Sequence, residues 1–277
     1  MEINSGRPGG SGSLAHRNRR RCCDWPEGCL GSCLHVTSAT RNYLNGLDQG
    51  TRQKSIFAPV GWPAEHAIKR PMYDDLITPH KPSDPKRVRA CEGGVEQYLP
   101  EGAVIVAFAM HLLRTVPDLR HVAIHPDGEH GKRFDFLGWL KKHGFAMITL
   151  MGNTGYGGMY QSVIGEKTVL INPKSGLGDV VADIGRRSFV AECKGGVTNS
   201  THAGQLSRLR KGLCETVGLL LSSPVAEGKR QFAVVPRTQL TENLARRMIV
   251  RAKAAGVEIA LVDGRGNVFD LASAHPE

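Results

Sequence analysis

No apolar run in this sequence is long enough to cross a membrane. The longest, residues 103–113, falls well short of the ~20 residues that a membrane-spanning helix needs. The first residues lack the charged segment and apolar stretch that together mark a secretory signal. The seven cysteines are odd in number, and Cys193 and Cys214 fall inside expected core elements, which fits reduced thiols better than a disulfide framework. These absences predict a cytoplasmic protein without a membrane span.

Acidic residues are scarce beside basic ones, because 26 Asp and Glu stand against 36 Lys and Arg and leave a net charge of +10. Residues 1–90 supply six of these ten charges, since they hold fourteen basic and eight acidic side chains. A basic excess of this kind suits contact with a polyanion such as nucleic acid. Residues 1–21 are rich in Gly, Ser and Arg and too poor in apolar side chains to fold alone.

We therefore divide the chain into a basic, partly disordered N-terminal region, residues 1–90, and an α/β domain, residues 91–277. Because every element needed for the sheet is expected after residue 100, a fragment that begins near Asp84 is expected to fold. The segment 22–35 carries four cysteines and His35, which are enough ligands for a structural zinc, although their spacing matches no standard finger. A zinc-stabilised regulatory protein built on this segment is one hypothesis.

Strand-like and helix-like segments alternate in the second half of the chain. Helices are expected at 128–143, at 239–255, and from a capping residue within 199–201 along an apolar stripe that ends at Leu220. Strands are expected at 121–125, 145–150, 178–184, 187–194, 231–236 and 257–262. The alternation predicts an α/β fold with a central mixed β-sheet flanked by helices.

The strand-like runs 178–184 and 187–194 are joined by Gly185-Arg186, a glycine-first hairpin signal. A two-residue turn pairs Ile184 with Arg187. The same register, continued along both strands, sets Asp179 opposite Glu192.

Side chains at i and i+2 share one face of a strand, so Lys194 is expected on the same side as Asp179 and Glu192, while Cys193 faces the other, apolar side. Two like charges opposite each other destabilise a sheet, and a bound cation is the simplest compensation. Carboxylate oxygens of this kind suit Mg²⁺ or Mn²⁺. The alternative interpretation is an exposed polar cluster in which Lys194 bridges the two carboxylates.

The acid-x-Lys triplet also occurs at Asp84-Pro85-Lys86 and Glu227-Gly228-Lys229, but both of these lie in turn-like sequence. Only the third copy ends a strand and has an aspartate facing it across a hairpin. The constellation, and not the triplet, indicates a metal site.

At these residues the chain resembles the PD-(D/E)XK nuclease superfamily, which has the restriction-endonuclease-like fold. In that superfamily an acid on one strand and an acid-x-Lys on the next bind the catalytic metal, and Gly178-Asp179 stands where the family has Pro-Asp. The resemblance covers roughly residues 125–262, and its motifs are short. It implies a phosphodiester hydrolase that depends on Mg²⁺ or Mn²⁺, with Asp179 and Glu192 as metal ligands and Lys194 as a further catalytic residue.

The resemblance also implies a helix that carries a glutamate near its start. The segment 128–143 offers Glu129, which we expect as a catalytic residue and third metal ligand, although a first-turn glutamate also complements a helix dipole. Glu92, Glu96 and Glu101 compete for this role. Some family members use a glutamine at the start of the helix after the lysine, where Gln205 stands here; the alternative for Gln205 is a solvated surface residue.

DNA is the expected substrate, from the resemblance and the basic charge, and RNA is left open. The sequence leaves endo- against exonuclease action undecided, and it is compatible with a homodimer or a partner subunit. The rival hypothesis is a non-catalytic nucleic-acid-binding subunit of the same fold, within a restriction, transposition or defence assembly. The complete set of two acids and a lysine favours the nuclease.

Overall fold

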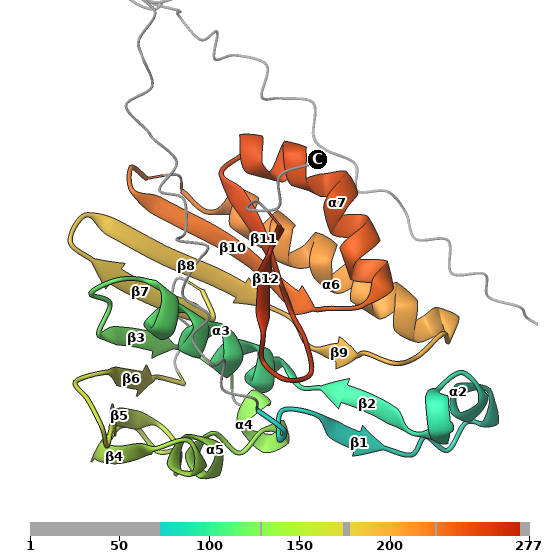
Figure 1. Ribbon diagram of the computed structural model, residues 1–277, viewed down its shortest axis with the longest axis horizontal. Helices are drawn as coiled ribbons and strands as arrows, with labels where there is room; N and C mark the ends of the chain where they lie inside the picture. The colour runs from blue at the N-terminus through green and yellow to red at the C-terminus, as the bar shows by residue number, and fades with distance from the viewer. Residues whose placement is uncertain (1–72, 128, 174–177, 225, 272–277) are drawn as a thin grey trace, which may run out of the picture. The chain divides into compact units, whose positions relative to one another are not determined.

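The computed structural model describes residues 73–127, 129–173, 178–224 and 226–271 (Figure 1). The chain divides into two units, residues 1–60 and 61–277, and all described residues belong to the second. The basic residues 1–21 and the segment 22–35 lie outside the described residues. Among the described residues, no helix is both long and apolar enough to span a membrane.

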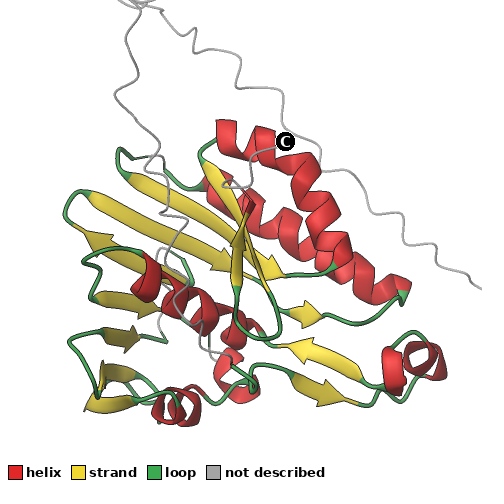
Figure 2. Ribbon diagram, viewed as in Figure 1, coloured by secondary structure: helices red, strands yellow, loops and turns green. Residues whose placement is uncertain are grey.

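The described residues form a mixed sheet of nine strands in the order β12-β11-β10-β8-β7-β3-β6-β5-β4. The strands are labelled in Figure 1 and drawn in yellow in Figure 2. Neighbours are parallel in the pairs β8–β10, β10–β11 and β3–β6, and antiparallel in the other five. The strands are β3 (His121–Ile124), β4 (Phe145–Leu150), β5 (Gly158–Ser162), β6 (Thr168–Ile171), β7 (Val180–Ile184), β8 (Arg187–Cys193), β10 (Lys229–Pro236), β11 (Val257–Val262) and β12 (Val268–Asp270).

Helices lie on both faces of this sheet. On one face, α3 (Glu101–Thr115) and α5 (Phe136–Lys142) pack into the larger of two apolar cores, and α4 (His130–Arg133) precedes α5. On the other face, α6 (Ala203–Ser222) and α7 (Gln239–Ala254) cover β8, β10 and β11 and enclose the second core. The expected α/β fold, a large mixed sheet flanked by helices, is confirmed.

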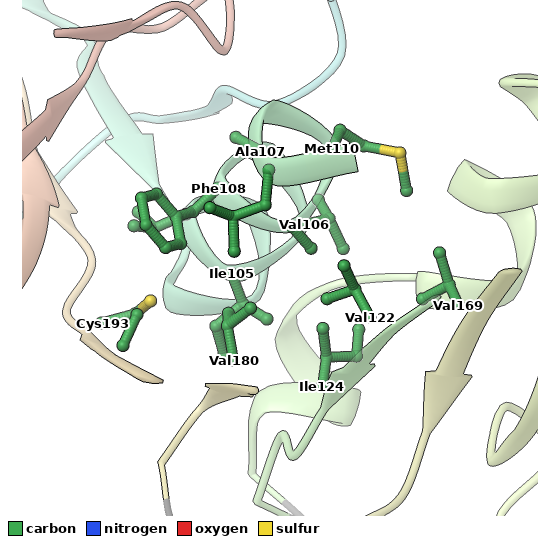
Figure 3. Packing of buried hydrophobic residues seen from close by; sticks show 14 of the residues in the cluster. Ile105, Val106, Ala107, Phe108, Met110, Val122, Ile124, Val169, Val180 and Cys193 are labelled. Atoms are coloured by element: carbon green, nitrogen blue, oxygen red, sulfur yellow. The ribbon is translucent and has the colours of Figure 1, made fainter. Parts of the chain in front are cut away.

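The apolar run 103–113 forms most of α3, whose side chains are buried almost all round in the larger core. Figure 3 shows Ile105 and Phe108 of α3 beside Val180 of β7 and Cys193 of β8. Burial of this much apolar surface is the main stabilising term for such a domain, at roughly 25 cal/mol per Å². It also fixes the start of α3 relative to the ends of β7 and β8.

A second, three-stranded sheet of order β1-β2-β9 is built from β1 (Thr78–His80), β2 (Glu96–Leu99) and β9 (Gly196–Val197). The helix α2 (Pro85–Arg89) and the 3₁₀ turn η1 (Glu92–Gly94) connect β1 to β2. Strand β9 follows β8 after two residues and pairs with β2, which leads directly into α3. The small sheet therefore ties the end of β8 to the start of α3.

Two expected helices differ from the structure. The segment 128–143 is interrupted between α4 and α5, because Asp135 accepts a hydrogen bond from the amide of Gly138 (2.9 Å) and so caps a new helix. The helix after β9 begins at Ala203 with His202 as its N-cap and without a side-chain cap, so residues 199–201 do not cap it. Asn199 instead binds the backbone of Val95 and Gln97 in the small-sheet region.

The boundary at residue 90 needs correction, because residues 73–90 belong to the folded domain. Tyr73 and Leu76 are buried in the larger core. Asp75 accepts a hydrogen bond from the indole of Trp139 (3.0 Å) and contacts His143 Nε2 (3.1 Å) on α5. These contacts were missed because the stretch is rich in Pro and Asp and has no periodic apolar pattern.

A fragment that begins at Asp84 is therefore expected to be much less stable than one that begins at residue 61, contrary to the expectation from sequence. Removing one large side chain from a core costs about 2–5 kcal/mol, and this truncation removes Tyr73, Leu76 and the edge strand β1. Thermal unfolding of the two fragments checks this. Equal melting temperatures would show that residues 73–83 do not support the core.

Candidate active site

The hairpin β7–β8 has the predicted register. Ile184 pairs with Arg187 across the two-residue turn, and the pairing continues to Val180 with Ala191. Gly185 adopts φ 58°, a left-handed conformation that costs glycine little. The regular pairing ends there, one residue short of Asp179 and Glu192.

Asp179 is held in place by three hydrogen bonds, two to β8 and one to the residue after β3. Its amide donates to the carbonyl oxygen of Ala191 (2.8 Å), and its own carbonyl oxygen accepts from the amide of His125, just after β3 (2.9 Å). Its side-chain Oδ2 accepts a hydrogen bond from the amide of Cys193 (2.7 Å). The carboxylate is therefore fixed beside Glu192 at the carboxyl end of β8, where parallel strands of α/β folds commonly bind ligands.

A close backbone approach accounts for the glycine before Asp179. A Cβ atom at Gly178 would lie 2.8 Å from Cγ1 of Val190 and 3.0 Å from the carbonyl oxygen of Ala191. A larger residue would push the start of β7 away from β8 and displace Asp179. Glycine at position 178 thus has a local steric reason.

Glu192 is half-buried, and its carboxyl group has an unusual pKa. Burial, followed by the negative charge of Asp179, raises the pKa of Glu192 to about 7, although Lys194 acts in the opposite direction. Burial also raises the pKa of the Cys193 thiol well above its ordinary value, so this neighbour stays a neutral thiol and not a thiolate ligand. Glu192 and Asp179 therefore form a pair of oxygen donors whose repulsion a cation would relieve.

Lys194 Nζ lies between acids from two helices. It is 3.2 Å from Oε1 of Glu101 at the start of α3 and 3.7 Å from Oε1 of Glu215 on α6. Burial lowers the pKa of Lys194, but the charges of Glu101 and Glu215 outweigh this and leave the pKa above its ordinary value. The side chain is consequently a protonated ammonium at neutral pH.

The backbone next to Lys194 explains how Glu101 comes to this position. Gly195 packs so closely on the start of α3 that a Cβ there would lie 2.5 Å from the amide nitrogen of Glu101. Gly212 of α6 lies over the Lys194 side chain, and its Cβ would be 3.3 Å from that of Lys194. These two glycines let α3 and α6 approach the end of β8 from opposite sides.

Glu129 is paired elsewhere and is not among the charges that shift the pKa of Glu192, so its predicted role as third metal ligand gains no support here. It is exposed and forms an ion pair with Lys132 (2.6 Å) at the start of α4. The lysine also holds the pKa of Glu129 below its ordinary value. Among the four glutamates considered, the structure brings Glu101 to the cluster, where its charge also affects the pKa of Glu192.

The structure excludes a solvated surface position for Gln205, while a functional role for it stays a prediction. It is buried, and its Nε2 donates to Oε1 of Glu96 (3.1 Å), which in turn accepts from Nε of Arg87 (2.8 Å). Gln205 is therefore neither a solvated surface residue nor a bonded partner of Asp179 or Glu192. It belongs to a polar network at the small sheet.

The donor chemistry of Asp179, Glu192 and Glu101 fits a hard divalent cation such as Mg²⁺ or Mn²⁺. As positioned, the acids are not gathered into a ligand cluster: within the described ranges, no three His, Cys, Asp or Glu side chains stand as a group that could hold a metal. Glu101 is engaged with Lys194, and one oxygen of Asp179 with the Cys193 amide. Metal binding at this site would require Glu101 to exchange its ammonium partner for the cation.

Replacing Glu192 with Gln is expected to stabilise the metal-free protein at pH 8. Because the folded pKa of about 7 lies above the ordinary 4.5, the folded state keeps a proton that the unfolded chain releases, and stability falls as pH rises between these values. Allowing for solvent screening, the loss is about 1–2 kcal/mol. Urea unfolding in EDTA at pH 5 and pH 8 measures it, and an equal pH dependence in wild type and E192Q would contradict the shift.

No protein-family model, curated protein or solved structure gives a significant match to this chain.

Proposed function

We propose that this protein is a metal-dependent nuclease of the PD-(D/E)XK type that hydrolyses phosphodiester bonds in DNA. One observation carries the proposal: Asp179 and Glu192 lie together at the carboxyl end of β8, with Lys194 two residues after Glu192 and with Glu101 beside Lys194. Two acids and a lysine in this order are the residues that the superfamily uses for its metal and its reacting phosphate.

The order of the elements supports a restriction-endonuclease-like fold. A helix with a glutamate at its start, α3, leads to strand β3; the hairpin β7–β8 then carries the two acids and the lysine, and α6 follows. The resemblance places a glutamate-bearing helix before the hairpin, and α3 meets this requirement in place of the segment around Glu129. Strands β4, β5 and β6 are then an insertion between β3 and β7.

Asp179, Glu192 and Glu101 would hold Mg²⁺ or Mn²⁺. When bound, such an ion polarises the phosphodiester and lowers the pKa of the attacking water. Glu192 has a pKa of about 7 in the metal-free protein, so it would have to lose its proton near neutral pH to bind the cation. Lys194 is protonated in the metal-free protein, where Glu101 and Glu215 hold its pKa above the ordinary value, so it would supply positive charge to the phosphoryl oxygens and not act as a base.

The net positive charge supports a nucleic acid as the substrate. The net charge of +10 favours a polyanion, and six of these charges belong to residues 1–90. Deletion of residues 1–60 removes the first unit, and with it most of the basic N-terminal region 1–90, and leaves the second unit, residues 61–277, intact. DNA is preferred to RNA on the resemblance.

The proposal is tested by incubating the purified full-length protein with circular and linear DNA and with RNA, in Mg²⁺, Mn²⁺ or EDTA. Cleavage that requires metal, and that E192A and K194A both lose while remaining folded, is the expected result. Metal-dependent cleavage that persists in both variants would overturn the assignment. Nucleic-acid binding without cleavage under any metal would instead identify a non-catalytic subunit of the same fold.

A further inference from the structure

A pocket of about 510 Å³ opens directly beside the candidate active site. Its wall includes Gly195, the residue after Lys194, and strands of the small sheet, which leads through β2 into Glu101. The opposite wall comes from the first turns of α6. The candidate catalytic residues do not account for this pocket, since Lys194 and Glu101 are not among its lining residues.

The pocket is lined by three arginines and one carboxylate. Arg87 and Glu96 are paired, which leaves Arg133 of α4 and Arg208 of α6 as an excess of two positive charges. Neither Arg133 nor Arg208 forms a salt bridge or hydrogen bond with another residue in the part of the chain that the structure describes, although the charge of Arg133 contributes to the lowered pKa of Glu129. Two arginines from different helices that face one pocket are suited to bind an anion.

The pairing of Arg87 with Glu96 makes the pocket wall rigid. Glu96 is 1% exposed, and its oxygens accept from two nitrogens of Arg87 and from Gln205. Arg87 binds Glu96 through Nε and one terminal nitrogen, so its planar guanidinium is fixed in orientation. This network of buried polar side chains explains why Gln205 is buried at the start of α6.

We propose that this pocket binds a nucleoside phosphate unit, with the phosphate on Arg133 and Arg208. The volume is larger than a phosphate alone requires, and Tyr98, Val197 and Leu209 provide an apolar and aromatic wall for the sugar and base. The unit is either part of a nucleic-acid strand or a free nucleotide. The strand alternative rests on the proposed nuclease function, since a strand held here passes next to Lys194.

Binding is measured in EDTA, so that cleavage cannot interfere, by fluorescence anisotropy of a short labelled single strand on the full-length protein. The single variants R133A and R208A are each expected to weaken binding by about ten- to a hundredfold, because each removes a charge-assisted contact. The matched control is R210A, which removes an exposed arginine of the same helix outside the pocket and is expected to change binding less than about threefold.

Competition with a nucleoside monophosphate distinguishes the two sources. Displacement of the strand by the monophosphate, lost in R208A, supports a pocket that recognises a free nucleotide. If only the unlabelled strand competes, and this competition is again lost in R208A, the pocket binds a phosphate unit within a nucleic-acid strand. Equal losses in R133A, R208A and R210A would overturn the pocket, even if the protein cleaves DNA. Selective losses in R133A and R208A without any cleavage would preserve the pocket and reject the nuclease.

Discussion

D179N is expected to lower metal-dependent cleavage by roughly 10²–10³-fold or more, whereas D183N should leave it within about twofold of wild type. Asp179 is fixed beside Glu192 by hydrogen bonds to Ala191, His125 and Cys193. Asp183 is exposed near the turn of the same hairpin, opposite Ser188. The two substitutions make the same chemical change at the two ends of one strand, and only Asp179 lies at the candidate site.

The comparison is made as initial rates over a range of Mg²⁺ concentrations. Thermal unfolding of both variants serves as the control, because Oδ2 of Asp179 also supports the backbone of Cys193. An asparagine keeps an oxygen for that hydrogen bond, so D179N should remain folded. A larger loss of cleavage in D183N than in D179N would show that our account places the metal at the wrong end of the hairpin.

E101Q is the second substitution with a large expected effect, and E129Q is its control. Glu101 contacts Lys194 at the start of α3, while Glu129 pairs with Lys132 on the surface. We expect E101Q to lower cleavage by about a hundredfold or more. The substitution removes the negative charge of a proposed metal ligand and the ion-pair partner of Lys194. E129Q should stay within about twofold of wild type.

Steady-state rates and the Mg²⁺ concentration for half-maximal activity separate two roles of Glu101. A metal ligand raises the required Mg²⁺ concentration, whereas a residue that only positions Lys194 lowers the rate at saturating Mg²⁺. Wild-type rates and an unchanged Mg²⁺ requirement in E101Q, together with a loss of cleavage in E129Q, would support Glu129 as the third metal ligand, as the sequence first suggested.

Local patterns in the sequence were sufficient to predict most of the sheet and helices. β11 was predicted at its observed bounds, and α7 within one residue, because each has a clear periodic pattern and a glycine or capping residue at its end. The prediction of one helix over residues 128–143 was wrong because Asp135 caps a new helix inside a continuous apolar pattern. Residues 73–83 were not predicted as part of the domain because their contacts with α5 are tertiary and leave no periodic pattern in the sequence.

The pair of acids on the hairpin could be predicted because one glycine fixes the turn and the turn fixes the register. The third acid could not be chosen from four candidates, since the approach of α3 to β8 depends on Gly195 and on the pairing of β2 with β9. One local signal favoured Glu101: it follows Pro100 and precedes the longest apolar run, a typical helix start. The network of Arg87, Glu96 and Gln205 joins residues over a hundred positions apart and left no local pattern.

The most direct measurement is calorimetric binding of Mn²⁺ to wild-type protein and to the double variant D179N/E192Q, in buffers of different ionisation enthalpy. The wild type is expected to bind Mn²⁺ saturably. It should release about half a proton at pH 7 and almost none at pH 9, because the pKa of Glu192 is about 7 and a ligand carboxylate must be deprotonated. The double variant should lose both the binding and the proton release. Equal Mn²⁺ affinity in the two proteins would contradict a metal centre at Asp179 and Glu192.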